Sequence, residues 1–137
     1  MQPGAILFHK QFAFHDGASA DKLLVVLGAT AQHLIVAKTT SQGTRYRNDH
    51  GCQAGNRFPA FLLTLGCCLL RKNTWVCLSE FYEVSVVELG NKIVSGEVYR
   101  LGLLPNPIAR DVQVCATQCD DISQVHEALV RACFVAP

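Results

Sequence analysis

Residues 3–42, PGAILFHKQFAFHDGASADKLLVVLGATAQHLIVAKTTSQ, contain three apolar runs separated by turn residues. The runs are Ala5–Phe8, Leu23–Leu27 and Leu34–Ala37, and they are rich in the Val, Ile, Leu and Phe that favour β-strands. An Asp-Gly pair in the segment HDG, residues 15–17, is a turn signal between the first two runs. We therefore predict three consecutive strands in this part of the chain.

The same pattern continues through the middle of the chain. Short apolar runs alternate with turn signals such as Gly66 and Gly90-Asn91. Several runs are solidly apolar rather than alternating, which indicates strands that are buried on both faces or curled around a small core. Many short strands at close spacing favour a mainly β fold, either a small barrel or a sandwich. The further strands that we expect are Phe61–Leu65, Thr74–Leu78, Tyr82–Leu89 and Asp111–Ala116.

The last part of the chain has a different pattern. Two prolines in LGLLPNPIAR, residues 101–110, indicate a turn near residue 105. Beyond it, Asp120 or Asp121 is a candidate N-cap for an amphipathic helix at about residues 121–134. We expect this helix to pack against the sheet through one apolar face. The apolar positions at helical spacing are Ile122, Val125, Leu129 and Cys133.

Composition limits the class of protein. The chain has 137 residues, of which 50% are hydrophobic and 17% charged, and its formal net charge is +1. Residues 1–137 therefore have the size and apolar content of a single domain, and the balance of charge argues against a polybasic protein. The longest apolar stretch, Pro59–Leu70, is too short to span a bilayer. No basic region precedes the first apolar run, so we expect no secretory signal.

The chain has seven cysteines, which is an odd number. Secreted disulfide scaffolds usually have an even set, and several of these cysteines lie among apolar neighbours, where a thiol packs as a small hydrophobe. We therefore expect reduced cysteines and a cytoplasmic protein. His50 and Cys52, the Cys67-Cys68 pair, and Cys115 with Cys119 offer zinc-type ligands but lack paired C-x2-C spacing, so we predict no metal and no cofactor.

A long polar loop lies between the third and fourth predicted strands. It spans residues 40–57, TSQGTRYRNDHGCQAGNR, and loops of this length in compact domains usually have a function. Its arginines can bind phosphates and its tyrosine offers a ring on which a base can stack. The candidate RNA-binding residues in this loop are Thr40, Arg45, Tyr46, Arg47 and Arg57.

The order of elements in residues 3–42 resembles the PemK/MazF-like toxin family. The shared features are a strand after Pro3-Gly4, a basic residue ahead of the VVL strand, and a third strand that ends in a Thr pair. The resemblance implies an SH3-like barrel and a toxin–antitoxin endoribonuclease that cleaves single-stranded RNA, held in check by an antitoxin protein. It also implies a homodimer. Lys22 stands where the family has Arg, and Leu23 stands where it usually has Pro.

Metal-independent RNA cleavage uses the 2′-hydroxyl of the substrate as the nucleophile. The protein must then supply a base, a cation or donor for the phosphorane charge, and an acid for the leaving oxygen. The resemblance places the family's Arg and Thr on Lys22 and Thr39, and an imidazole at His50 or His15 can shuttle a proton. We therefore predict Lys22, Thr39 and His50 as catalytic residues.

Two alternatives stay open from the sequence. The Lys at the family's Arg position favours a non-catalytic barrel of the same fold that acts as a binding or regulatory module, because an ammonium lacks the fixed fork of a guanidinium. The other alternative is an unrelated β-barrel that serves as a regulatory or structural protein of a phage or mobile element.

Overall fold

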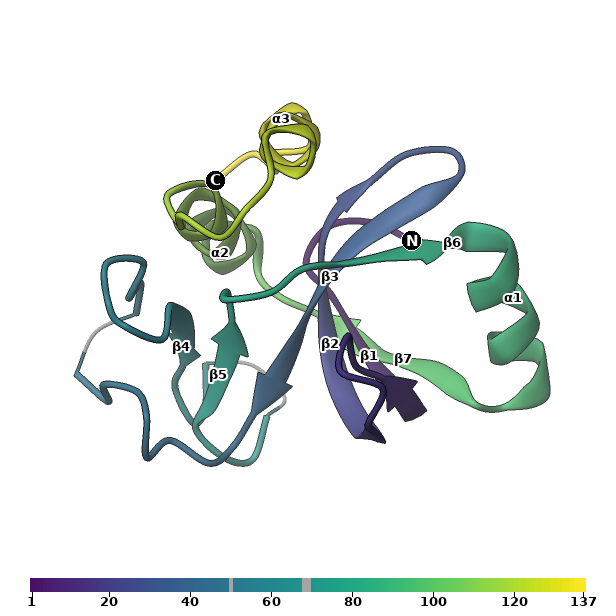
Figure 1. Ribbon diagram of the computed structural model, residues 1–137, viewed down its shortest axis with the longest axis horizontal. Helices are drawn as coiled ribbons and strands as arrows, with labels where there is room; N and C mark the ends of the chain where they lie inside the picture. The colour runs from purple at the N-terminus through teal and green to yellow at the C-terminus, as the bar shows by residue number, and fades with distance from the viewer. Residues whose placement is uncertain (50, 68–69) are drawn as a thin grey trace.

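The structure is a computed structural model that describes residues 1–49, 51–67 and 70–137. Within these residues, seven strands pair antiparallel in the order β4-β5-β3-β2-β1-β7, and β6 pairs with β3 beside this path (Figure 1). The strands are β1 (Ala5–Ala13), β2 (Ser19–Ala29), β3 (His33–Thr40), β4 (Ala60–Leu63), β5 (Thr74–Cys77), β6 (Tyr82–Ser85) and β7 (Val98–Leu103). The helices are α1 (Val86–Ser95), α2 (Asn106–Thr117) and α3 (Gln124–Ala132).

The mainly β class predicted from the sequence is confirmed. The first three predicted strands are β1, β2 and β3, each longer than its apolar run, and two of the later ones are β4 and β5. Over the described residues, β4 and β7 are the two ends of the strand order and do not pair with each other, so the sheet is not closed. The same part of the chain has no helix that is long and apolar enough to cross a membrane.

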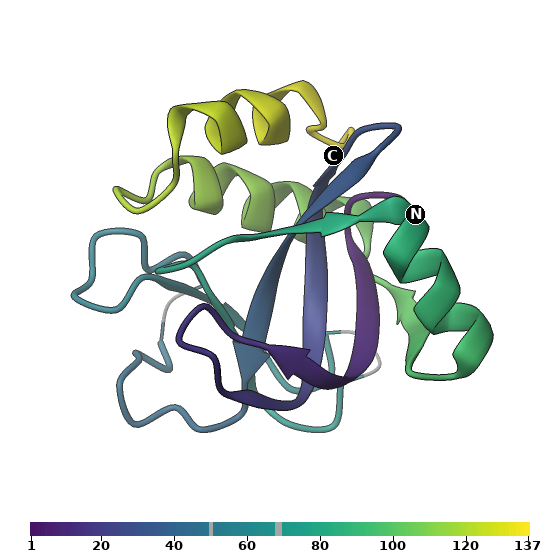
Figure 2. The ribbon, with the colours of Figure 1, turned by 45° about the vertical axis from the view of Figure 1, so that its right-hand side comes forward.

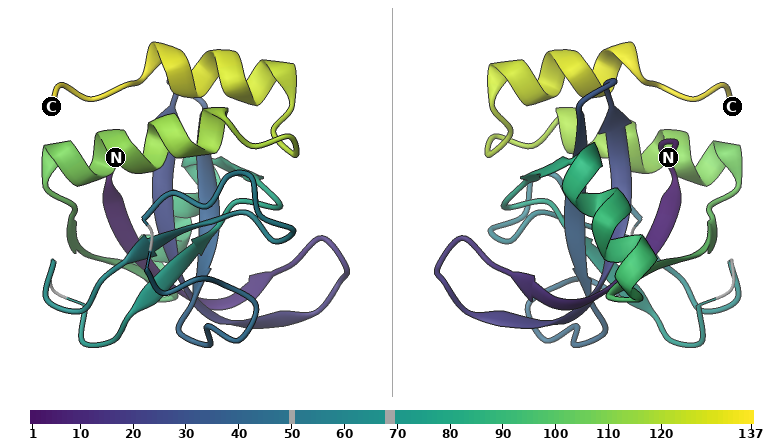
Figure 3. Two further views of the ribbon diagram at one scale, coloured as in Figure 1. Left: turned by 90° about the vertical axis from the view of Figure 1, so that its left-hand side faces the viewer. Right: turned by 90° about the vertical axis from the view of Figure 1, so that its right-hand side faces the viewer.

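The sheet has an apolar core on each of its faces, which explains the solidly apolar strands. Along β2, Val25 and Leu27 belong to a core with residues of α2 and α3. Leu24 and Val26 point to the other face and join a core with Leu89 of α1. Figures 2 and 3 show α2 and α3 stacked over one side of the sheet, with α1 at its other side. The prediction of strands buried on both faces is confirmed.

The predicted strand Asp111–Ala116 is wrong, because these residues belong to helix α2. Pro105 stands at the N-cap position and Pro107 in the first turn, where a missing backbone N–H costs little. Ala109, Val112 and Ala116 are buried at helical spacing. The prolines that indicate a turn near residue 105 therefore also begin a helix.

The predicted strand Tyr82–Leu89 is correct only for its first half. The chain leaves β6 at Ser85 and continues as α1 because the Ser85 side chain accepts a hydrogen bond from the Glu88 backbone N–H at 3.3 Å. Ser-x-x-Glu is the pattern of a capping box, and it outweighs the apolar run that precedes Leu89. The helix α1 and the strand β7 that follows it are elements that the sequence analysis does not predict.

The predicted C-terminal helix is confirmed as α3, with two corrections. The N-cap is Ser123, whose Oγ accepts from the His126 N–H at 3.1 Å, rather than Asp120 or Asp121. The buried residue of this helix is Val130, whereas Val125 is 73% exposed. Ile122 and Leu129 pack against the core as the spacing predicts, whereas Val125 does not.

Strand β3 is the central element of the sheet and positions the site described below. One of its edges pairs with β2, and its other edge pairs first with β6 and then with β5. The change of partner brings Thr39 and Thr40 opposite Val76 and Trp75 of β5. The long β3–β4 loop begins directly after this point, so its first residues lie at the same end of the sheet.

Candidate nucleic-acid interface

Two adjoining hollows lie where β3 ends, with volumes of about 340 Å³ and about 290 Å³. Lys22, Thr39, Thr40 and Gln42 line both hollows, and we call the combined depression the Lys22 groove. Side chains with hydroxyl, amide or charged groups make up most of its lining. The first hollow is also lined by Lys38, Thr44, Arg45, Tyr46, Phe58 and Glu80.

Lys22 stands on β2 at the boundary between the two hollows. Its side chain is half-buried, and Nζ donates a hydrogen bond to the Thr39 carbonyl oxygen at 3.4 Å. The same Nζ lies 5.9 Å from the centre of the Phe14 ring, a distance typical of a weak cation–π contact. The structure thus brings Lys22 and Thr39 together, although they lie on different strands.

Thr39 contributes its backbone rather than its side chain to the groove. The residue is only 5% exposed, and its hydroxyl donates a hydrogen bond to the Leu23 carbonyl oxygen at 2.9 Å. The hydroxyl proton therefore takes part in a hydrogen bond within the sheet. The neighbouring Thr40 is half-buried, and its Oγ1 accepts a hydrogen bond from the Gln42 N–H at 3.1 Å, which orders the first turn of the loop.

Lys38 and Glu80 form an ion pair on one wall of the groove. Lys38 Nζ lies 2.9 Å from Glu80 Oε1, and the Tyr82 hydroxyl donates to Glu80 Oε2 at 3.0 Å. Burial alone would raise the pKa of the Glu80 carboxyl, but the hydrogen bonds from Lys38 and Tyr82 lower it below its ordinary value. Glu80 is thus an ionised partner for Lys38 and a weak base.

His15 lies at the edge of this wall, where it packs against the fold. Its ring stacks on the Tyr82 ring, with the centres 4.0 Å apart and an interplanar angle of 5°. Because a carbonyl oxygen can only accept, Nε2 is the donor in its 2.9 Å hydrogen bond to Phe81 O. His15 lines neither hollow of the groove.

The β3–β4 loop supplies the outer wall of the groove. The Arg45 guanidinium lies 5.0 Å from the centre of the Phe58 ring, and Arg45 is exposed. The Tyr46 ring packs on Trp75, and its hydroxyl lies 3.6 Å from Cys77 Sγ. Burial raises the pKa of Tyr46, so its phenol stays protonated and offers a neutral polar group.

Gln53 holds the loop in this shape. It is 3% exposed, its side chain accepts from the Arg47 N–H at 2.9 Å, and its Nε2 donates to the Arg47 carbonyl oxygen at 2.7 Å. The Trp75 indole N–H donates to the same carbonyl oxygen at 2.8 Å. These contacts fix the backbone of Arg47, and with it the neighbouring residues Arg45 and Tyr46.

The remaining predicted loop residues lie elsewhere. The Arg47 side chain is exposed and does not line the groove. It forms a bidentate ion pair with Asp49, with Nε 3.0 Å from Oδ1 and Nη2 2.8 Å from Oδ2. Arg57 does not line the groove, but its guanidinium lies 5.5 Å from the ring centre of Phe58, which does. His50 lies outside the described residues.

Several residues that line the groove are not predicted from the sequence, among them Lys38, Phe58 and Glu80. Lys38 directly precedes the Thr pair, and Phe58 ends the loop before Pro59, so both were near positions that the analysis singled out. Glu80 lies in the segment between β5 and β6, and its position depends on the pairing of β3 with both of those strands. Only that tertiary pairing could have revealed Glu80.

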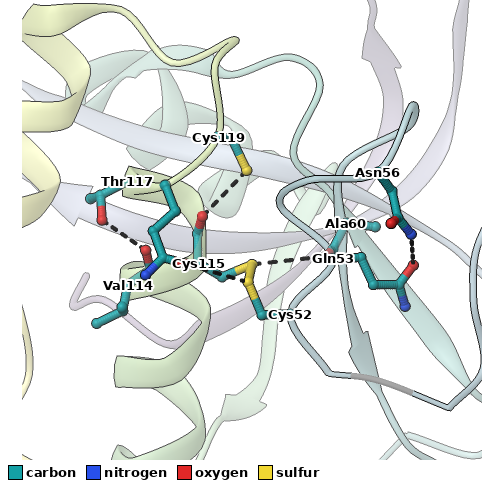
Figure 4. Close-up of a disulfide and its surroundings, with 9 residues drawn as sticks. Cys52, Gln53, Asn56, Ala60, Val114, Cys115, Thr117 and Cys119 are labelled. Atoms are coloured by element: carbon teal, nitrogen blue, oxygen red, sulfur yellow. Dashed lines mark hydrogen bonds between the residues drawn. A yellow bond between two sulfur atoms is a disulfide. The ribbon is translucent and has the colours of Figure 1, made fainter.

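The expectation of reduced cysteines is wrong for two of them. Cys52 of the β3–β4 loop and Cys115 of α2 form a disulfide, 63 residues apart in the sequence (Figure 4). Within the residues that the structure describes, no three His, Cys, Asp or Glu side chains are grouped to hold a metal ion. The described cysteines outside this disulfide are Cys67, Cys77, Cys119 and Cys133.

No protein-family model matches the chain, and no curated protein matches it. The resemblance to PemK/MazF-like toxins therefore stays a prediction.

Proposed function

We propose that the protein is a cytoplasmic single-stranded RNA-binding protein and that RNA phosphates bind in the Lys22 groove. The observation that carries this proposal is the position of Lys22, whose ammonium stands at the boundary of two adjoining hollows. Glu80 neutralises Lys38, whereas the hydrogen bond of Lys22 goes to the neutral carbonyl oxygen of Thr39. The charge of Lys22 is thus available for a phosphate, which dominates the affinity of proteins for nucleic acids.

The outer wall of the groove suits a single strand. Arg45 is exposed and lies over Phe58, so its guanidinium presents a flat cationic face next to the hollow. Unstacked bases of RNA can stack on such guanidinium planes. The side chains of Thr44, Gln42 and Ser41 add hydrogen-bond donors and acceptors for phosphate and 2′-hydroxyl groups. An apolar partner helix would find no comparable match among these polar groups.

Binding without cleavage is the form of this proposal that we favour. Cleavage needs a positioned base and acid, but the Thr39 hydroxyl donates to Leu23 O, and the lowered pKa of Glu80 makes its carboxylate a weak base and keeps it from acting as an acid. These contacts support the non-catalytic alternative, and the assignment of the fold to the SH3-like barrels is part of the proposal.

A metal-independent endoribonuclease is the second candidate. The closeness of Lys22 and Thr39 where the two hollows adjoin favours it, since the resemblance assigns the two catalytic positions to these residues. In this case Lys22 stabilises the phosphorane charge and His50 shuttles the proton. The antitoxin partner and the homodimer belong to this second candidate.

The first test is the affinity for RNA as a function of salt. We expect the wild type to bind a fluorescent oligouridine of roughly twelve nucleotides at low salt, as measured by fluorescence anisotropy. Lys22→Ala should weaken binding and reduce the slope of log affinity against log salt by about one. Lys10→Ala is the matched control, because Lys10 is exposed and lines neither hollow.

The same samples separate the two candidates. With a chelator present, the favoured proposal expects the RNA to stay intact. Cleavage that disappears in both Lys22→Ala and His50→Ala would establish the second candidate instead. If the wild type binds no RNA at low salt, both candidates lose their basis.

A further inference from the structure

The Cys52–Cys115 disulfide connects the wall of the groove to the helical layer of the molecule. Cys52 lies in the β3–β4 loop, whereas Cys115 lies in α2, which packs over the sheet. The next residue, Gln53, holds the Arg47 backbone through two side-chain hydrogen bonds. A chain of direct contacts therefore runs from the disulfide through Gln53 and Arg47 to Arg45 and Tyr46.

The disulfide is open to attack from one side. It forms part of the wall of a third cavity of about 280 Å³, which is also lined by Phe61, Asp111 and Gln118. Cys52 is exposed, while Cys115 is 1% exposed and its sulfur lies beside the carbonyl oxygen of Ala60 (Figure 4). A small thiol can thus reach the sulfur of Cys52, and Cys115 is the leaving group.

We propose that Cys52–Cys115 is a thiol–disulfide exchange site whose reduction by a dithiol releases the β3–β4 loop and so weakens the groove. The loop-release part stands on the contacts above, and the weakened RNA affinity rests on the proposed function. In the cytoplasmic location proposed above, disulfides are usually transient or redox-sensing, which fits a bond whose exposed cysteine, Cys52, lies on the β3–β4 loop.

The exchange reaction balances with a dithiol as the named reductant. One thiolate of the dithiol attacks Cys52 Sγ and forms a mixed disulfide, while the Cys52–Cys115 bond breaks and Cys115 leaves as a thiolate that takes up a proton. The second thiolate of the reductant then attacks its own sulfur in the mixed disulfide. This step closes the oxidised reductant and releases Cys52, which is also protonated. The protein gains two electrons and two protons, and the dithiol loses them.

The loop itself supplies a readout that does not depend on RNA. Trypsin can cleave after Arg45, Arg47 and Arg57, and local release of the loop should raise these cleavage rates roughly five-fold or more. Cleavage after Lys92 in α1 is the internal reference, because global unfolding would raise cleavage there equally. Alkylation and peptide mass measurement report whether Cys52 and Cys115 are oxidised in the same sample.

We therefore compare oxidised and dithiothreitol-reduced wild type with Cys52→Ser and Cys133→Ser. Reduction should speed loop cleavage in the wild type and lower oligouridine affinity by roughly five-fold or more. Cys52→Ser should behave as reduced protein whether or not the reductant is present. Cys133→Ser is the matched control, because Cys133 is half-buried and serine can keep its hydrogen bonds with Ala29.

The outcomes separate this inference from the proposed function. Faster loop cleavage without any RNA binding in either state would support loop release and overturn the proposed function. RNA binding could depend on Lys22 while neither RNA affinity nor loop cleavage changes on reduction. That result would overturn the inference and leave the proposed function in place. Alkylation of both Cys52 and Cys115 in protein purified without reductant and treated with a mild oxidant would also overturn it.

Discussion

The hydroxyl of Thr39 illustrates how burial decides the role of a single residue. At 5% exposure, with a 2.9 Å hydrogen bond to Leu23 O, this hydroxyl joins β3 to β2. The resemblance assigns a catalytic role to the same position. A structural hydroxyl and a catalytic hydroxyl respond differently to substitution, so the two roles can be separated.

We expect Thr39→Val to lower the free energy of unfolding by about 1–3 kcal/mol, because Leu23 O loses its donor in a buried position. Thr39→Ser keeps the hydroxyl and should lose less. Urea unfolding followed by the fluorescence of Trp75, the single tryptophan of the chain, measures both values. RNA affinity should be the same in Thr39→Val as in the wild type. Unchanged stability combined with lost RNA cleavage would instead assign Thr39 to catalysis.

His9 gives the protein a pH dependence that originates in one residue. It is 3% exposed, with Nδ1 donating to Lys10 O at 2.8 Å and Nε2 accepting from Lys92 Nζ at 3.4 Å. Burial lowers the pKa of His9 below 6.5, and the Lys92 ammonium adds to this effect, although the Lys10 hydrogen bond opposes it. The folded protein therefore holds His9 neutral.

The sign of the effect follows from proton linkage. Below pH 6.5 the unfolded chain binds a proton at His9 before the folded chain does, so acidification favours unfolding. We expect the free energy of unfolding to decrease between about pH 7 and about pH 5. His9→Gln should make this decrease smaller, whatever its effect on stability at neutral pH. An equally steep decrease in the variant would assign the pH dependence to other groups.

At the scale of elements, local patterns predict strands well and transitions poorly. The runs Leu23–Leu27 and Leu34–Ala37 are apolar on both faces, and this signal alone is enough to identify β2 and β3. The segment from Asp111 to Ala116 has valines that also suit a strand. Its helical state depends on Pro107 in the first turn and on burial of one face under α3.

The candidate site shows the same division between local and tertiary information. Lys22, Thr40, Arg45 and Tyr46 are predicted from the sequence and all line the Lys22 groove. The hydrogen bond of the Thr39 hydroxyl, the pairing of Glu80 with Lys38 and the contact of Arg47 with Trp75 depend on segments that are distant in the sequence. The pairing of Cys52 with Cys115 has no sequence signal either, since spacing cannot tell which cysteines meet.

At the scale of the whole molecule, one buried side chain connects three layers. Gln113 of α2 is 1% exposed, and its Nε2 donates to Leu27 O of β2 at 2.9 Å and to Cys133 O at 2.8 Å. Its Oε1 accepts from the Val135 N–H at 2.9 Å. The Gln113 amide thus connects the sheet, α2 and the segment after α3. An apolar side chain could not make these hydrogen bonds.

We expect Gln113→Leu to lower the free energy of unfolding by about 3 kcal/mol or more, because it leaves Leu27 O, Cys133 O and the Val135 N–H without partners. Gln124→Leu is the control on the exposed side of α3 and should change stability by about 0.5 kcal/mol or less. Urea unfolding gives both values, and amide hydrogen exchange at Val135 should become faster in Gln113→Leu. The free energy of unfolding could fall while exchange of the Val135 N–H becomes faster only as much as global unfolding does. In that case the Gln113 side chain stabilises the protein through the packing of α2 alone. The connection between the layers would then rest on the apolar contacts of Val112 and Val130 in the core.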